Sequence, residues 1–253
     1  PTILDYRTAL HKSLAKSSDL RVSLCDISWS LLWYFVEERR KMTRKNPNYH
    51  GECRCSSISE SLNEKQKQAV GNALQEGISI VQGPPGTGKT HTAVRILEGW
   101  TKQDIGTVLA VADSNVAVDN LLEGLLGRSV RAVRLGQPVK VREGLRDATV
   151  DAMMEKHTLR KDLIENIELN EKLARKSRGM RGGKEKGLAH RDLKRGWKEV
   201  RRIEGEIRDD ILDRAQVLCC TCIGSGHELL DGRKFPRVLI DEATQATEPA
   251  SLV

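Results

Sequence analysis

The pattern of apolar and polar residues changes near residue 62. Before it, apolar and charged residues mix without strand-like alternation in "DYRTALHKSLAKS" and "WSLLWYFVEERRKM", which predicts helices within residues 1–42. Residues 43–61 then collect Asn, Pro, Gly and Ser, which are typical of turns and domain boundaries. We therefore expect residues 1–61 to form an N-terminal helical segment and linker.

From residue 62 onward, short apolar runs alternate with amphipathic stretches of helical character. Apolar runs bounded by loops are typical of buried strands in a parallel sheet with helices on both faces. The runs are "ISIVQ" at 78–82, "TVLAVA" at 107–112, "VRAVRL" at 130–135, "AQVLCCTCIG" at 215–224 and "FPRVLIDEA" at 235–243. The sequence thus predicts an α/β domain over residues 62–253.

A long, charged and helix-favouring stretch interrupts this alternation at residues 143–214. Because "SRGMRGGKEKG" breaks it near residues 177–187, we expect an inserted helical hairpin with a glycine-rich tip. The whole chain carries a net charge of +7, whereas residues 172–202 hold thirteen Lys and Arg against three acids, a net +10. Positive charge is therefore concentrated in the insertion, which favours a polyanionic partner.

Composition is that of a globular, intracellular protein. The 253 residues and 38% apolar content suffice for a buried core. Six cysteines without a disulfide framework favour a reducing compartment, so we expect a cytoplasmic or nuclear location. Three of them fall within an expected strand, where thiols pack as small apolar groups: Cys219, Cys220 and Cys222. The apolar run at residues 27–36 falls short of the roughly 20 residues of a membrane helix, and we expect no membrane partner.

The segment "GPPGTGKT" at residues 83–90 has the pattern of a phosphate-binding loop between a strand and a helix. In such a loop, glycines let backbone N–H groups face the phosphates, a lysine places positive charge beside them, and a hydroxyl binds Mg²⁺. The alternative is a glycine-rich turn followed by Lys-Thr by chance. We predict that Lys89 also serves catalysis, that Thr90 binds the metal ion, and that ATP is bound by Gly83, Pro85, Gly86, Thr87, Gly88, Lys89 and Thr90.

A second acidic motif lies far along the chain, in "RVLIDEA" at residues 237–243. The apolar run predicts a strand that delivers Asp241 and Glu242 at its carboxyl end, where ligands bind in open α/β sheets. We predict that Asp241 holds Mg²⁺ and that Glu242 orients and deprotonates the attacking water. Alone, such a pair would usually mark only a strand that ends at the surface. Together with the loop at residues 83–90, it indicates an ATP-hydrolysing enzyme.

Further motifs lie in a fixed order around these two: "LNEKQKQAV" before the loop, then "VADSNVAVDNLL", "VRLGQPVKV", "CCTCIGSG" and "DEATQATEP". The ordered set resembles superfamily 1 helicases of the up-frameshift type. The resemblance covers about residues 62–253 and implies the first RecA-like motor domain of an ATP-dependent RNA or DNA helicase. It also implies that Gln66 reads the adenine of ATP, and that Ser114, Asn115 and Thr221 contact the backbone of a single strand.

The sequence departs from the family pattern in two respects. Asp113 stands where the family usually has proline, and puts an acidic group beside the expected phosphate contact at Ser114 and Asn115. Those two residues lie between a strand and a helix, so helix capping is an alternative role for them. The family's γ-phosphate-sensing glutamine, second RecA-like domain and arginine fingers have no counterpart before Val253. We therefore expect slow hydrolysis and no unwinding by this chain, since an arginine finger is worth roughly 10³ to 10⁵ in rate.

Within the insertion, Lys194, Arg195 and Lys198 are the candidates for electrostatic nucleic-acid binding. The alternative is a solvated helix face supported by pairs such as Glu168 with Lys172. Three functions stay open: a helicase motor, an ATP- and nucleic-acid-binding module without unwinding activity, and an AAA+ ATPase. The AAA+ class shares the phosphate loop and the acidic strand end, but leaves the other motifs unexplained.

Overall fold

The computed structural model describes residues 61–179, 182–247 and 250. The chain divides into two compact units, residues 1–53 and residues 54–253, and every described residue belongs to the second unit. The helices expected within residues 1–42 lie outside the described residues.

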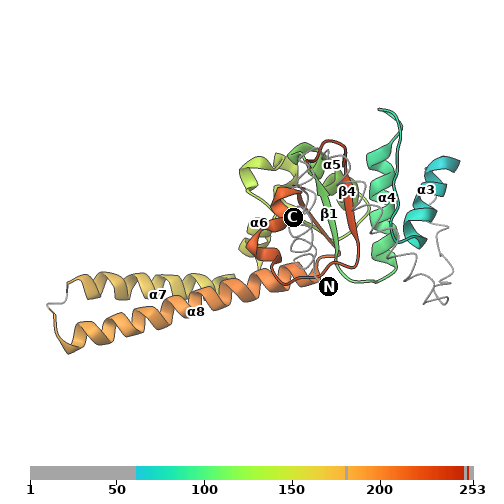
Figure 1. Ribbon diagram of the computed structural model, residues 1–253. Coiled ribbons are helices and arrows are strands. Elements are labelled where there is room, and N and C mark those ends of the chain that lie inside the picture. The colour runs from blue at the N-terminus through green and yellow to red at the C-terminus, as the bar shows by residue number, and fades with distance from the viewer. Residues whose placement is uncertain (1–60, 180–181, 248–249, 251–253) are drawn as a thin grey trace, which may run out of the picture. The chain divides into compact units, whose positions relative to one another are not determined.

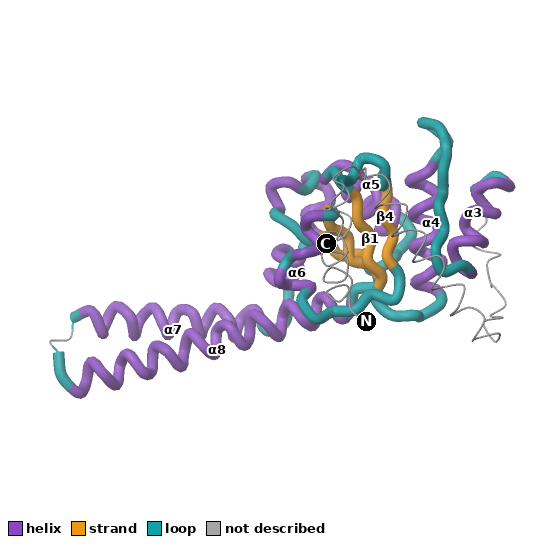
Figure 2. The backbone as a smooth tube through the Cα atoms, viewed as in Figure 1, coloured by secondary structure: helices purple, strands orange, loops and turns teal. Residues whose placement is uncertain are grey.

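Four parallel strands form the sheet at the centre of the second unit (Figures 1 and 2). They are β1 (Val108–Ala112), β2 (Ala132–Arg134), β3 (Val217–Thr221) and β4 (Val238–Asp241). Their order across the sheet is β2-β3-β1-β4, and each neighbouring pair is parallel. Parallel neighbours require crossover connections, which the intervening helices provide. The predicted α/β sheet is confirmed.

The described part of the chain has six α-helices and four short 3₁₀ helices. The α-helices are α3 (Glu64–Gln75), α4 (Lys89–Lys102), α5 (Asn115–Leu126), α6 (Val150–Lys156), α7 (Arg160–Arg178) and α8 (Lys184–Arg214). The 3₁₀ helices are η1 (Pro138–Lys140), η2 (Glu143–Ala148), η3 (Ile223–Gly226) and η4 (Glu228–Leu230). None of the helices in the described part of the chain is both long and apolar enough to cross a membrane.

Helices cover both faces of the sheet, and β1, one of its two inner strands, is apolar at every position. Successive side chains of a strand point to opposite faces, and all five residues of β1 are buried. Val108 and Ala110 share one core with the apolar sides of α3, α4 and α5. Leu109 and Val111 share the other core with α6 and the C-terminal half of α8. The sheet is therefore the middle of three layers, and its carboxyl edge carries the loops that follow β1, β3 and β4.

One predicted strand is wrong. Residues 78–82 form no strand, and Ile80 is 76% exposed although its apolar run predicted burial. A strand needs a neighbour for its backbone hydrogen bonds. Among the described residues, β4 pairs only with β1, and residues 78–82 pair with no strand. The apolar run therefore stays extended, and leads directly into the phosphate-loop segment.

The insertion contains a helical hairpin, in which α7 packs along α8 (Figure 2). Close approach of the two helices depends on Gly196 of α8, which faces the buried side chain of Asn170 on α7. The C-terminal half of α8 joins the second core through Ile203, Ile207 and Ile211. Since β3 begins three residues after α8 ends, the hairpin is anchored to the sheet through a short connection.

Candidate functional site: a phosphate loop and an acidic strand end

The phosphate-loop segment leads into the N-terminus of α4. Gly86 and Gly88 have φ values of 77° and 78°, in the left-handed region that glycine adopts without steric cost. Gly88 is the N-cap of α4, and no side chain caps the helix. The N–H groups of the first turn are therefore left for another acceptor, which in this loop pattern is a phosphate.

Lys89 closes the loop on itself in this structure. Its Nζ donates to the carbonyl oxygens of Gly83 at 2.9 Å and Pro84 at 3.0 Å. The Thr87 hydroxyl also donates to the Pro84 carbonyl, at 2.7 Å. The ammonium group is thus held across the mouth of the loop by two neutral acceptors. Phosphate oxygens would bind it more strongly, because hydrogen bonds between charged groups are the stronger ones.

Thr90 in the first turn of α4 and Asp241 at the end of β4 lie side by side, although they are 151 residues apart in the chain. The Thr90 hydroxyl donates to Asp241 Oδ2 at 3.1 Å. Asp241 ends β4 and is only 8% exposed, and its other oxygen accepts the Glu242 N–H at 3.0 Å. A hydroxyl and a carboxylate side by side are hard oxygen donors of the kind that Mg²⁺ prefers, together with phosphates and water. The donor set therefore fits the predicted metal ion.

Glu242 has an unusual backbone conformation. Its φ is 53°, in the left-handed region, which costs a non-glycine residue roughly 1–2 kcal/mol. Its carbonyl accepts the Gln245 N–H at 2.8 Å, and its side chain is exposed. Such strain persists where surrounding structure imposes it, and it is found most often at functional sites. The conformation turns the chain directly after Asp241, so that the two carboxylates lie at the same edge of the sheet.

Gln66 links the start of α3 to the phosphate-loop segment. Its Oε1 accepts the Asn63 N–H at 3.0 Å while Asn63 accepts the Gln66 N–H at 2.9 Å, which is a capping box. Its Nε2 donates to the Thr87 carbonyl at 3.0 Å. Both ends of the amide are therefore engaged, and one N–H and one lone pair remain for the predicted contact with adenine.

Ser114, Asn115 and Thr221 also lie at the carboxyl edge of the sheet. Thr221 and Asp241 both pair with Ala112 of β1, so β1 separates the expected nucleic-acid contact from the expected metal ligand. Ser114 caps α5 by accepting the Ala117 N–H at 3.1 Å, as the capping alternative predicts. Thr221 accepts the Gly224 N–H at 3.1 Å. Both hydroxyl hydrogens are still able to donate.

The basic residues of the hairpin lie on a different element. Lys194, Arg195 and Lys198 are exposed on α8, and none of them forms an ion pair with a described residue. At 1.5 Å of rise per residue, Lys198 lies about 24 Å along the helix from Arg214, where α8 ends. The structure thus gathers Ser114, Asn115 and Thr221 at the sheet edge and leaves the three basic residues on the hairpin.

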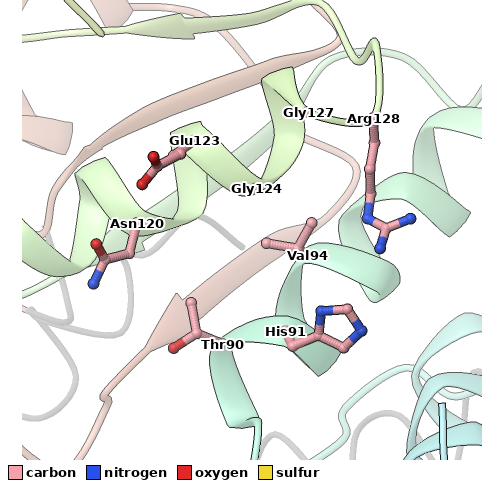
Figure 3. A pocket seen from close by; sticks show the side chains of 8 residues that line it. All are labelled: Thr90, His91, Val94, Asn120, Glu123, Gly124, Gly127 and Arg128. Carbon is pink, nitrogen blue, oxygen red and sulfur yellow. The ribbon is translucent and has the colours of Figure 1, made fainter. Parts of the chain in front are cut away.

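A cavity of about 480 Å³ lies beside Thr90, between α4 and α5 (Figure 3). Its walls carry groups of both signs, among them Glu123 and Arg128. Partial burial lowers the pKa of His91 on the same wall, and the charges of Arg128 and Arg95 lower it further. Because the lining mixes acidic and basic groups, the cavity favours neither an anion nor a cation by itself.

The three buried cysteines have no role at the site. Burial raises the pKa of Cys219 and of Cys220 to about 12, and it also raises that of Cys222. A thiol that stays protonated at neutral pH is a poor nucleophile and a poor metal ligand. All three are free and buried, as expected for small apolar groups in a core strand.

Sequence reasoning missed one residue near the candidate site. Arg134 at the end of β2 is only 1% exposed, and its Nη2 donates to Asn115 Oδ1 at 2.8 Å. The available signal was a charged residue inside the apolar run at residues 130–135. A charge in such a run is rarely buried without a partner.

A parallel sheet covered on both faces, a glycine-rich loop entering a helix, and an acidic strand end beside the loop's threonine define a P-loop nucleoside triphosphatase of the RecA-like type. A family model described as an AAA domain matches residues 61–253. The chain belongs to this family. Its fold and the order of its motifs are those of a superfamily 1 helicase motor domain of the up-frameshift type.

Several curated proteins are similar to the chain over 76% of its length. It is 38% identical to "ATP-dependent helicase NAM7" of Saccharomyces cerevisiae and 37% identical to "Regulator of nonsense transcripts 1 homolog" of Arabidopsis thaliana. It is 31% identical to "DNA polymerase alpha-associated DNA helicase A" of Schizosaccharomyces pombe. The matched part spans 18%, 14% and 29% of these relatives, respectively.

Proposed function

We propose that the chain is the first motor domain of an ATP-dependent helicase that acts on single-stranded nucleic acid. The observation that carries the proposal is the hydrogen bond between Thr90 and Asp241, because it joins the two halves of a nucleotide site across the sheet. Similarity to relatives that are named as helicases, one of them as an ATP-dependent helicase, supports the same function. The motifs at residues 111–122 and 219–226 favour it over an AAA+ ATPase, as they supply polar groups for a second ligand.

In this proposal, each part of the nucleotide site has a separate task. The N–H groups of residues 86–90 and the ammonium of Lys89 bind the phosphates. Thr90 and Asp241 would hold Mg²⁺, which supplies positive charge to the phosphates when bound. Glu242 orients the attacking water and accepts its proton, since its carboxylate follows the metal ligand directly. Gln66 supports both the loop and the adenine.

The nucleic acid would contact the same edge of the sheet. Hydroxyl and amide groups at Ser114, Asn115 and Thr221 can donate to backbone oxygens, and such contacts position a strand without reading its bases. The basic residues of the hairpin would add an attraction that is independent of sequence. Neither contribution distinguishes RNA from DNA, so the proposal covers both.

Titration with a fluorescent ATP analogue tests the nucleotide site. We expect Lys89→Ala to weaken Mg²⁺-dependent binding by about 10- to 150-fold, because hydrogen bonds to charged groups are worth about 1.5–3 kcal/mol. Glu242→Gln should bind the analogue as tightly as the unaltered chain, yet abolish its slow ATP hydrolysis. Lys65→Ala, an exposed lysine of α3, is the matched control. Binding that survives Lys89→Ala, or hydrolysis that survives Glu242→Gln, would overturn this assignment of roles.

A further inference from the structure

A buried guanidinium group lies behind the candidate nucleic-acid contact at Asn115. Arg134 donates from Nε to Asp119 Oδ1 at 3.3 Å, from Nη2 to Asn115 Oδ1 at 2.8 Å, and from Nη1 to the Leu135 carbonyl. The backbone makes room for it at Gly136, whose φ is 128° and where an added Cβ would lie 3.3 Å from Arg134 Nη1. All three guanidinium nitrogens are therefore satisfied within the fold.

Asp119 keeps this guanidinium in place. It lies on α5 and is only 4% exposed, and its second oxygen accepts the Arg142 N–H at 2.9 Å. A buried charge is stable only when it is paired and hydrogen-bonded, and both conditions hold here. Arg134 and Asp119 thus link β2, α5 and the segment before η2. Asp119 lies about one helical turn after Asn115 on α5, so this linkage lies next to Asn115.

The bond to Arg134 decides which end of the Asn115 amide is available. A guanidinium group can only donate, so the atom facing it must be the amide oxygen. The amide nitrogen is left with two N–H groups, and it makes no hydrogen bond with any other described residue. Asn115 is partly exposed at the first position of α5. It therefore offers a donor to an outside acceptor.

We propose that Arg134 is a positioning residue that holds Asn115 so that its amide nitrogen donates to a phosphate oxygen of the nucleic-acid backbone. This inference rests on the proposed function, because it deepens the role of the same sheet edge. A phosphate oxygen can only accept, which matches the two N–H groups that the Asn115 amide nitrogen leaves free. A fixed amide also loses less conformational entropy on binding than one that flips freely.

Asn115→Asp tests the orientation without removing Arg134. The carboxylate accepts from Arg134 through a charge-assisted bond and suits the N-terminus of α5, so we expect an unchanged or higher thermal midpoint. It has no donor, however, and it repels phosphate. Fluorescence anisotropy with a labelled single-stranded oligonucleotide should show at least a tenfold loss of affinity, about 1.4 kcal/mol. A lowered midpoint, or an unchanged affinity, would overturn the proposal.

A double-mutant cycle tests the dependence on Arg134. We expect Arg134→Lys to weaken oligonucleotide binding, because it releases the amide that Asn115→Ala removes. The double variant should bind no more weakly than Asn115→Ala alone, because Arg134 acts only through Asn115. Affinity for the ATP analogue should stay unchanged. Additive losses would show that Arg134 acts independently of Asn115 and would overturn its positioning role.

Arg131→Lys is the matched control, because Arg131 directly precedes β2 but donates to the Arg214 carbonyl and not to Asn115. It should leave oligonucleotide affinity unchanged. If Asn115→Ala binds the oligonucleotide as tightly as the unaltered chain does, the inference fails and the proposed function stands. If the unaltered chain binds no oligonucleotide at all, the proposed function fails, and the inference fails with it.

Discussion

At the scale of single residues, the candidate nucleotide site depends on backbone conformations that few residue types adopt. Gly86 and Gly88 are left-handed in the loop, and Glu242 is left-handed directly after Asp241. Glycine adopts this conformation without steric cost, whereas glutamate does not. The pattern of glycines in the sequence therefore predicts the loop well, but nothing in the sequence marks the strain at Glu242.

Gly88→Ala should reduce the affinity for Mg-ATP by about 5- to 30-fold, since a left-handed backbone costs alanine about 1–2 kcal/mol. The added Cβ would also lie 2.9 Å from Gln66 Nε2 and would disturb the bond from Gln66 to the loop. Titration with a fluorescent ATP analogue measures the loss. Gly71→Ala in α3, where an added Cβ meets nothing within 4 Å, should bind normally. Equal affinity for both variants would contradict this account.

At the scale of elements, the hairpin illustrates how a helix contact is decided by one small residue. An added Cβ at Gly196 would lie 1.8 Å from Asn170 Oδ1, so no side chain fits unless the Asn170 side chain or α7 itself moves. Asn170 itself is buried and donates to the Asn166 carbonyl at 2.9 Å. The sequence predicts two helices here, but it does not show which face of each one meets the other.

Gly196→Ala should lower the free energy of unfolding by about 1–3 kcal/mol, because overpacking this contact displaces the buried Asn170 side chain or forces the helices apart. Thermal denaturation, together with the rate of trypsin cleavage within the hairpin, measures the effect. Gly205→Ala in the same helix meets nothing within 4 Å and should instead stabilise by up to about 1 kcal/mol, as alanine favours helix over glycine. The same sign for both variants would contradict the packing described.

At the scale of the whole described unit, the candidate contacts with nucleic acid fall into two groups of different chemistry. The sheet edge offers neutral donors at Ser114, Asn115 and Thr221, whereas the candidates on α8 are the exposed positive charges of Lys194, Arg195 and Lys198. Only charged contacts release counterions from a nucleic acid, so only they affect the dependence of affinity on salt. The two groups can therefore be separated by experiment even if they bind the same strand.

Replacing Lys194, Arg195 and Lys198 together by Gln should reduce the slope of log affinity against log salt by up to about 2, since each contact with a single strand contributes about 0.7. Asn115→Ala should lower affinity and leave the slope unchanged. Anisotropy titrations with single-stranded RNA and DNA at several salt concentrations measure both. Replacing Lys65, Lys156 and Lys234 together by Gln removes the same amount of positive charge outside α8, and this variant is the control. If it reduced the slope equally, α8 would be only a solvated face.

Much of the fold could be predicted from local pattern alone. Four of the five apolar runs form the strands of the sheet, and the loop at residues 83–90 enters α4 as expected. The run at residues 78–82 failed because a strand depends on a neighbour, which periodicity cannot supply. The sequence predicts the capping role of Ser114 as an alternative, but it does not predict that both ends of the Gln66 amide form hydrogen bonds.

The sequence by itself determined which chemical groups this protein has: a phosphate loop, an acidic strand end and a basic insertion, each carried by consecutive residues. Only the tertiary structure decided which of them meet. Thr90 Oγ1 lies 3.1 Å from Asp241 Oδ2 because the start of α4 packs beside the carboxyl end of β4. Arg134 reaches Asn115 because β2 and α5 pack together. The physical reason is that such contacts join residues far apart in the chain, and packing alone selects them.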